Sequence, residues 1–233
     1  MSRQIVVSGG GGFWYGSDGL ALDSFVLSLV GKTRPKVCYL ATAAGDSEEF
    51  IQGFYDNLGA SCQATHLPLF LPPFRSPVEA LSDQDVIYVS GGSTANMLAI
   101  WRLHGIDRML RLALASGTIL YGSSAGGLCW FESGVSDSLG FDGALRPLPN
   151  GLGFLSGSHC PHFDEPSRRS AYLGMVQCGA LPAGFGVDEL AALHFVDGQV
   201  HQTVASSSGA GAHLVRRGDN DASTVDRLPV TRV

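Results

Sequence analysis

Short apolar segments alternate with segments of helical length along the first half of the chain, and this alternation limits the fold more than any other feature. We expect strands at residues 4–8, 36–41, 61–66, 85–89 and 118–122. We expect helices near residues 20–30, 47–58 and 93–102, with more helix to about residue 115. Nearly continuous apolar strands joined by helices are typical of a parallel sheet covered on both faces. The sequence therefore predicts an α/β fold.

The last third of the chain has a different pattern. Residues 190–195 and 199–204 flank Asp197-Gly198, which predicts a β-hairpin with a type I′ turn, and a further strand is expected near residues 213–217. Residues 67–74 are rich in proline and are expected to form a loop. No repeat or long linker divides the sequence, so we expect one domain over residues 1–233.

The composition excludes several classes of protein. Only 15% of the 233 residues are charged, the net charge is −6 and no basic cluster is present, which argues against nucleic acid or an anionic membrane as a partner. Five widely spaced cysteines support neither a disulfide framework nor a zinc site. We expect no metal or organic cofactor. No segment has the pattern of a signal peptide or a membrane span. We expect a cytoplasmic protein that is a monomer or a homodimer.

The strongest chemical signal is Gly-Ser-Ser-Ala-Gly at residues 122–126, directly after an apolar strand. It fits the G-x-S-x-G pattern of a nucleophile elbow, in which small neighbours permit a strained turn that exposes the serine hydroxyl. Ser124 is the candidate nucleophile, and the N–H of Ala125 is the natural oxyanion donor. The Gly-Gly turn at residues 91–92 lies at the end of the preceding strand, so Gly92 is the second expected donor.

A serine nucleophile needs a base and an acid that orients the base. His159 and His162 are both candidates for the base, and in an extended segment they would face opposite sides. For the acid we prefer Asp137, in a loop that can return to the elbow. Glu132 is the alternative, at the end of a helix expected to begin at Ser124, about two turns away.

The glycine run at residues 9–12 follows the first strand but does not match a nucleotide-binding motif. G-x-G-x-x-G fails in every register, and no phosphate-binding loop of the G-x-x-x-x-G-K-[ST] type occurs. We interpret the run as a place where the backbone packs closely beside a cleft.

Three segments taken together resemble the peptidase E and cyanophycinase family of serine peptidases. They are Val-Ser-Gly-Gly-Ser-Thr-Ala-Asn at 89–96, Gly-Ser-Ser-Ala-Gly-Gly-Leu-Cys-Trp-Phe-Glu at 122–132, and Ser-His-Cys-Pro-His-Phe-Asp at 158–164. The resemblance implies a three-layer α/β/α sandwich with a mostly parallel sheet, like that of class I glutamine amidotransferases. It also implies that Ser124 is the nucleophile and His162 the base, and it leaves both Asp137 and Glu132 open as the acid.

The same resemblance implies a dipeptidase that cleaves after an N-terminal aspartate in small peptides. An aspartyl carboxylate calls for a rigid cationic fork, and Arg168 and Arg169 are the best-placed candidates, with Arg146 behind them. Three alternatives remain: a cyanophycinase-like hydrolase of β-aspartyl-arginine links, an α/β-hydrolase esterase, and a non-catalytic binding protein of the same fold.

Overall fold

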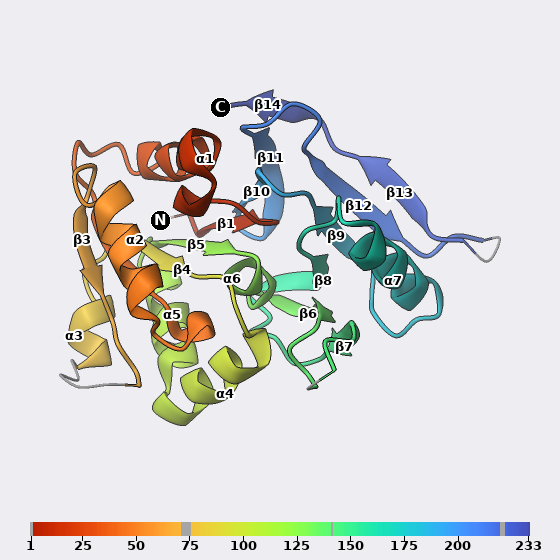
Figure 1. The fold of residues 1–233 in the computed structure, drawn as a ribbon, viewed down its shortest axis with the longest axis horizontal. Coiled ribbons are helices and arrows are strands. Elements are labelled where there is room, and N and C mark those ends of the chain that lie inside the picture. The colour runs from red at the N-terminus through yellow and green to blue at the C-terminus, as the bar shows by residue number, and fades with distance from the viewer. Residues whose placement is uncertain (1, 71–75, 141, 220–221) are drawn as a thin grey trace.

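The computed structural model describes residues 2–70, 76–140, 142–219 and 222–233, and its largest element is an eight-stranded sheet with the order β14-β11-β10-β1-β5-β4-β2-β3 (Figure 1). Five neighbouring strands are parallel: β1 (Gln4–Ser8), β5 (Ile119–Ser123), β4 (Val86–Val89), β2 (Lys36–Leu40) and β3 (Gln63–His66). The remaining strands are β10 (Ala191–Val196), β11 (Gln199–Ala205) and β14 (Val230–Arg232). The prediction of a mostly parallel sheet is confirmed.

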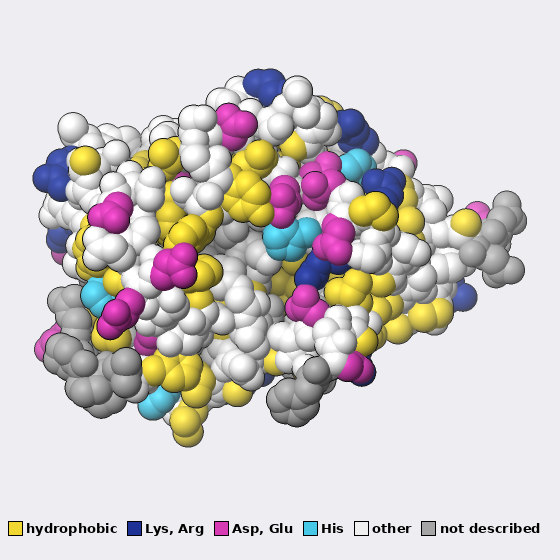
Figure 2. All heavy atoms as spheres, in the orientation of Figure 1, with side chains coloured by type: hydrophobic (Ala, Val, Ile, Leu, Met, Phe, Trp, Pro, Cys, Tyr) yellow, Lys and Arg dark blue, Asp and Glu magenta, His cyan; other side chains and the backbone are white. Residues whose placement is uncertain are grey.

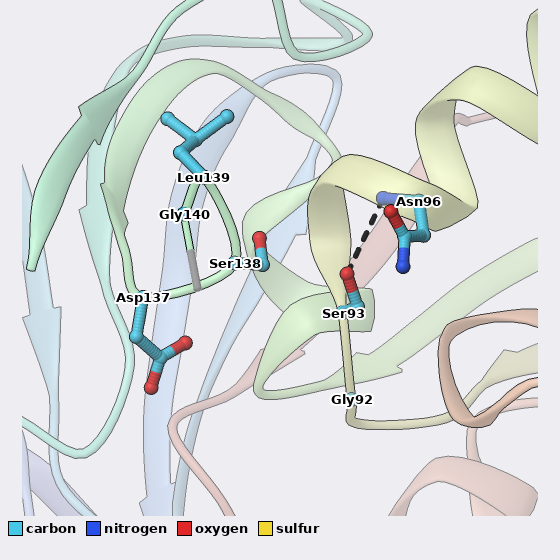
Figure 3. A pocket seen from close by; sticks show the side chains of 7 residues that line it. All are labelled: Gly92, Ser93, Asn96, Asp137, Ser138, Leu139 and Gly140. Atoms are coloured by element: carbon cyan, nitrogen blue, oxygen red, sulfur yellow. Dashed lines mark hydrogen bonds between the residues drawn. The ribbon is translucent and has the colours of Figure 1, made fainter. Parts of the chain in front are cut away.

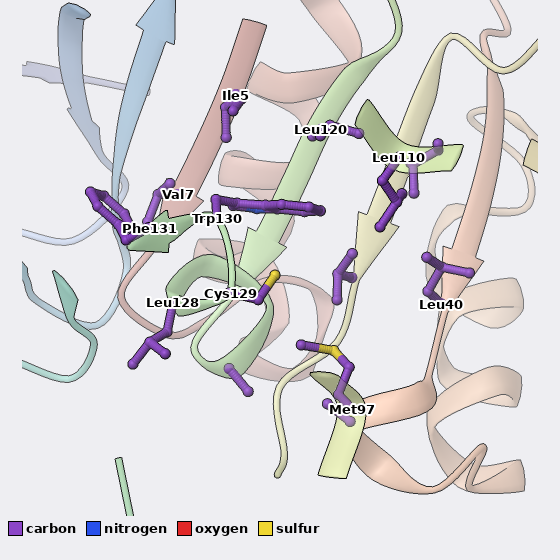
Figure 4. Close-up of a cluster of buried hydrophobic side chains, with 14 of the residues drawn as sticks. Ile5, Val7, Leu40, Met97, Leu110, Leu120, Leu128, Cys129, Trp130 and Phe131 are labelled. Atoms are coloured by element: carbon purple, nitrogen blue, oxygen red, sulfur yellow. The ribbon is translucent and has the colours of Figure 1, made fainter. Parts of the chain in front are cut away.

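Helices cover both faces of this sheet. On one face lie α1 (Gly16–Ser28) and α2 (Glu48–Leu58), and on the other α3 (Pro77–Leu81), α4 (Thr94–His104) and α5 (Ile106–Ala115). The strands are apolar on both sides, since Val6 packs in the cluster under α1 while Val7 packs in the opposite cluster. Figure 4 shows this second cluster, in which Trp130 lies among apolar side chains of the strands and of the segment after α6. The result is the expected three-layer sandwich.

Helix starts follow local side-chain chemistry only in part. Ser93 caps α4, because its hydroxyl oxygen accepts a hydrogen bond from the Asn96 N–H at 3.3 Å. Ser47 stands at the same position before α2, yet within the described residues its side chain makes no capping bond. Two short 3-10 helices, Phe13–Tyr15 and Thr42–Ala44, follow β1 and β2. Part of the loop expected at 67–74 lies outside the described residues.

The C-terminal hairpin is confirmed. β10 pairs antiparallel with both β1 and β11, and the hairpin turn has φ of +50° at Asp197 and +83° at Gly198. Two successive positive φ values are those of a type I′ turn, which explains the Asp-Gly sequence there. The pairing of β10 with β1 brings the C-terminal part of the chain beside the first strand.

A second sheet of six strands was not expected. Its order is β13 (Thr224–Arg227), β12 (Ala212–Arg216), β9 (Gly184–Val187), β8 (Leu155–Cys160), β6 (Phe131–Ser136) and β7 (Arg146–Leu148). Of these strands only β12 was predicted, at residues 213–217. Helix α7 (Pro166–Gln177) packs on this sheet through Tyr172 and Val176. The helices of the described residues include none with the length and apolar character needed to cross a bilayer.

The helix expected to run from Ser124 to Glu132 is much shorter. Helix α6 comprises only Ala125–Leu128, and Glu132 lies on strand β6. Two glycines within α6 and the buried Trp130 and Phe131 after it explain the early end, since glycine weakens a helix and the two rings pack in the core. The premise that placed Glu132 on a helix two turns from the serine was therefore wrong.

Candidate active site

Ser124 stands at a sharp turn between β5 and α6. Its backbone has φ +52° and ψ −111°, a conformation that residues other than glycine rarely adopt. The Ser124 N–H donates to the Ser8 carbonyl at 3.1 Å, which holds the turn against β1. A side chain at Gly122 would collide with the Gly126 carbonyl. The turn therefore needs small neighbours, and it has the geometry of a nucleophile elbow.

His162 faces the serine. Its Nε2 lies 2.8 Å from Ser124 Oγ, and its backbone N–H donates to the Gly9 carbonyl at 2.9 Å. The other candidate, His159, is fully buried, its Nδ1 lies 3.0 Å from the Phe185 carbonyl and its ring stacks on Phe131. Burial lowers the pKa of His159 to about 3. The geometry of a base thus belongs to His162, while His159 is a residue of the core.

Glu189 completes the arrangement, and sequence reasoning missed it. Its Oε1 lies 2.9 Å from His162 Nδ1 and also accepts a hydrogen bond from the Tyr15 hydroxyl at 2.8 Å. The backbone N–H of Glu189 donates to Asp164 Oδ1 at 2.9 Å, which orients the short segment between β9 and β10. Burial and the Glu189 carboxylate raise the pKa of Tyr15 to about 12, so Tyr15 remains a hydrogen-bond donor. The available signal in the sequence was that an acidic residue directly precedes the predicted hairpin, which made Glu189 a further candidate for the acid.

The structure contradicts both acids that the sequence suggested as the partner of His162. Asp137 follows β6 and forms an ion pair with Arg168 at 2.5 Å. Glu132 is exposed and accepts a hydrogen bond from the Gly157 N–H at 2.8 Å. The physical reason is strand β6, which pairs with β8 in the second sheet: Glu132 lies on this strand and Asp137 directly follows it, whereas Glu189 reaches His162 from the segment between β9 and β10.

The expected oxyanion donors lie beside the serine. Ala125 is the first residue of α6. A Cβ atom on Gly91 would lie 3.5 Å from Ser124 Cβ, and one on Gly92 would collide with the Ala43 carbonyl. The turn after β4 is therefore packed tightly between the elbow and the segment after β2. Only glycine fits at position 92, because the space for a side chain is filled and φ is +132°.

Two hollows flank Gly92. The first, which we name the aromatic pocket, has a volume of about 240 Å³, contains Ser124 and His162 in its wall and is lined by the rings of Trp14, Tyr15, Tyr39, Phe50 and Tyr88. The second has a volume of about 560 Å³ and lies between the start of α4 and residues 137–140 (Figure 3). Figure 2 shows acidic side chains beside a hollow near the middle of this face of the molecule.

Comparison with known proteins supplies the classification. The model of peptidase family S51 matches residues 5–203. The chain belongs to peptidase family S51. Membership identifies this S51 protein as a serine-type peptidase, and the resemblance seen in its sequence is confirmed at the level of the family.

This S51 peptidase is similar to one protein in sequence and to two solved structures in fold. An uncharacterized peptidase of Bacillus subtilis (strain 168), YgaJ, is 43% identical over 230 residues, covering 98% of each chain. A peptidase from an acI-B1 Actinobacterium has a TM-score of 0.72 at 20% identity, covering 99% of this chain and 95% of its own. A Listeria monocytogenes EGD-e protein provisionally assigned as peptidase E has a TM-score of 0.63 at 15% identity, covering 89% of this chain and 100% of its own. The two structures support the fold.

The three arginines considered for substrate binding differ in their surroundings. Arg168 of this S51 peptidase lies between Asp137 and Glu165, which is 3.1 Å from its Nε, and its side chain is 15% exposed. Arg169 lies over the Phe163 ring at 4.6 Å. Arg146 forms an exposed ion pair with Asp142 at 2.7 Å. Arg168 contacts Asp137 and Arg146 lies against Gly140, and both Asp137 and Gly140 line the second hollow.

The glycine run after β1 packs as the sequence predicted. A Cβ atom on Gly9 would overlap the Val187 carbonyl, and one on Gly10 would lie 2.6 Å from His162 Cε1 and 2.8 Å from His162 Nδ1. A Cβ atom on Gly12, where φ is +75°, would collide with the Tyr88 hydroxyl oxygen. The run therefore lets the first loop lie directly against the histidine and the aromatic pocket.

We expect Gly10→Ala to reduce kcat/KM by about 100-fold, because the added methyl would displace the imidazole and a misplacement of about 1 Å at a reacting group has an effect of that order. Steady-state kinetics and a melting temperature measure the activity and the stability. Gly174→Ala on α7 is the matched control, since nothing lies within 4 Å of its added Cβ. A Gly10→Ala enzyme with normal kcat/KM would contradict the account.

Proposed function

We propose that this S51 peptidase hydrolyses short peptides at their N-terminal residue through a triad of Ser124, His162 and Glu189. One observation carries the proposal: His162 Nε2 lies 2.8 Å from Ser124 Oγ while its Nδ1 lies 2.9 Å from Glu189 Oε1. This is the order of contacts in which an acid orients a base and the base activates a hydroxyl.

In the proposed reaction, His162 removes the proton of the Ser124 hydroxyl as Oγ attacks the peptide carbonyl carbon. Glu189 accepts the Nδ1–H of His162, which keeps Nε2 free as the base and stabilises the imidazolium that forms. The N–H groups of Ala125 and Gly92 donate to the oxyanion. His162 then gives its proton to the leaving amine, and water hydrolyses the acyl-enzyme by the reverse proton movements.

The narrower activity expected from the sequence is cleavage after an N-terminal aspartate. We propose that this specificity depends on Arg168, which would bind the aspartyl carboxylate of the substrate. The guanidinium of Arg168 already contacts Asp137 and Glu165. Their side chains are 46% and 53% exposed, so a substrate carboxylate would replace one of them on the same donor fork. Its entry would use the second hollow, which Asp137 lines.

The test is hydrolysis of Asp-Leu, Glu-Leu, Ala-Leu, a β-aspartyl dipeptide, an N-blocked Asp peptide and a simple ester by purified protein. We expect cleavage of the free dipeptides, with the blocked peptide spared and Asp-Leu preferred over Ala-Leu. Arg168→Gln is expected to lower that preference by about tenfold or more, the equivalent of one charge-assisted hydrogen bond. Arg216→Gln, in an exposed ion pair with Asp226 on the second sheet, is the control and should keep the preference.

The possible results distinguish the proposed peptidase activity from the proposed preference for aspartate. Equal rates for Asp-Leu and Ala-Leu would refute the aspartyl preference and leave the peptidase in place. Preference for the β-aspartyl dipeptide would favour the cyanophycinase-like alternative. Hydrolysis of the ester alone would favour an esterase. No turnover, together with no labelling of Ser124 by a fluorophosphonate, would refute the triad and favour a binding protein.

A further inference from the structure

We propose that the aromatic pocket binds an apolar or aromatic side chain of one of the two substrate residues that flank the scissile bond. This inference rests on the proposed peptidase function and adds a substrate class to it. It differs from the aspartyl preference, which depends on Arg168 and the second hollow, so one dipeptide can satisfy both.

The position of the pocket limits which part of a substrate can enter it. Ser124 and His162 form part of its wall, together with Gly92 on the side of the oxyanion donors. A peptide whose carbonyl carbon lies next to Ser124 Oγ therefore has this hollow within reach of its nearest side chains only. The occupant belongs to a residue that flanks the bond to be cleaved.

The size of the pocket suits a single side chain. Its volume is about 240 Å³. An apolar protein cavity of about 150 Å³ is large enough to hold benzene. The pocket therefore has room for a phenyl or branched aliphatic side chain, but it is smaller than the sites of about 300–1,000 Å³ that enclose whole drug-sized ligands.

The wall of the pocket consists mainly of aromatic rings and small residues, beside the imidazole of His162. The part of the lining that lies in described residues contains no Lys, Arg, Asp or Glu. Tyr39 and Tyr88 are 1% and 3% exposed, whereas Trp14 and Tyr15 are 41% and 44% exposed. Buried, rigid rings at the bottom of a pocket and exposed rings at its edge suit an apolar side chain. Its binding is favoured by the removal of apolar surface from water and by packing against the ring faces.

The exposed ring of Trp14 is held in place by its neighbours. It lies 4.7 Å from the Phe50 ring of α2 and 5.3 Å from the Phe13 ring, centroid to centroid. Gly53 of α2 lets the helix approach, because its added Cβ would lie 3.2 Å from Trp14. A large aromatic side chain fixed at the edge of a catalytic hollow is typical of a residue that contacts a ligand.

One buried acid lies close to this wall without lining the pocket. Asp23 of α1 is 1% exposed and its Oδ1, like the Tyr88 hydroxyl, lies near Gly12. Burial raises the pKa of Asp23 to about 7, and the hydroxyls of Tyr121 and Tyr88 act in the opposite direction. It lies outside the described lining of the pocket, so it offers a cationic side chain no direct contact.

The test compares the dipeptides Ala-Ala, Phe-Ala, Ala-Phe, Asp-Ala and Asp-Phe. We expect phenylalanine at one of the two positions to raise kcat/KM about tenfold or more over alanine there, as burial of a large apolar side chain contributes about 1.5–3 kcal/mol. Trp14→Ala should lower this Phe-to-Ala ratio severalfold, and Trp14→Phe should restore most of it. Leu103→Ala, which removes an exposed side chain of α4 outside the pocket, should leave the ratio unchanged.

A second measurement makes the result independent of turnover. Binding of Phe-Ala, Ala-Phe and Ala-Ala to the Ser124→Ala protein is measured by calorimetry, with Trp14→Ala added as a second change. If no dipeptide is hydrolysed but a phenylalanine dipeptide binds more tightly and Trp14→Ala removes the difference, the pocket stands and the peptidase proposal fails. If phenylalanine gives no advantage in rate or in binding, the inference about the pocket is overturned.

Discussion

Replacing Ser124 by alanine is expected to reduce kcat by about 10⁴-fold or more, the scale of loss when the nucleophile of a serine triad is removed. The serine Oγ is the atom that the geometry offers to a substrate, since the base nitrogen His162 Nε2 lies 2.8 Å from it and can accept the hydroxyl proton. The measurement is single-substrate kinetics on the best dipeptide of the panel. A fluorophosphonate adduct mapped to Ser124 in the unchanged protein is the chemical counterpart.

The folded structure should survive this change. Alanine occupies the same small volume in the elbow, and the Ser124 N–H that bonds to Ser8 belongs to the backbone. A melting temperature close to that of the unchanged protein therefore separates lost chemistry from lost folding. Ser170→Ala, an exposed hydroxyl deletion on α7, is the matched control and should retain full activity. Turnover by Ser124→Ala near the normal rate would show that the nucleophile is another group.

Replacing Glu189 by glutamine is expected to reduce kcat by about 10²- to 10⁴-fold, a loss of the size seen when the acid of a triad becomes an amide. An amide NH₂ can donate to His162 Nδ1, which moves the ring proton to Nε2 and removes the base that faces Ser124. Glutamine keeps the shape of the side chain, so the change in stability should be small. Kinetics from pH 5 to 9 and a melting curve measure both effects.

The two acids suggested by the sequence, Glu132 and Asp137, serve as controls for the Glu189 variant. Glu132→Gln should leave kcat on Ala-Leu within about threefold of normal, because its carboxylate bonds to Gly157 at an exposed site and surface contacts of this kind contribute little. Asp137→Asn should also preserve kcat on Ala-Leu, since its partner is Arg168. A loss in Asp137→Asn as large as that in Glu189→Gln would overturn the assignment of the acid.

The main sheet and Ser124 could be predicted because their signals are local. The continuous apolar run at β4 predicts a strand buried on both faces, and both of its faces are covered by helices. Asp197-Gly198 predicts a turn that requires two positive φ values, and both are present. Ser124 could be predicted because a strained elbow needs small residues at fixed positions around it.

The second sheet escaped prediction because its strands have weak local patterns. Strand β8 contains Gly157, and β9 contains Gly184 and Gly186, residues that are uncommon in strand interiors. The structure explains them, since a side chain at Gly157 would press on the Ala183 carbonyl and one at Gly186 would overlap the Phe163 ring. Their need for glycine comes from close approach to other segments, which short-range sequence patterns do not reveal.

The sequence by itself determined which segments of the first half form strands and helices and where the elbow at Ser124 lies, and through its resemblance to a family it indicated His162 as the candidate base. Only the tertiary structure shows which carboxylate lies beside His162. Glu189 lies 27 positions after His162, and it reaches the imidazole because β10 pairs with β1 and because glycine at position 10 lets the histidine ring approach. Strand propensities and turns depend on neighbouring residues, whereas the partner of a side chain depends on which distant segments pack together.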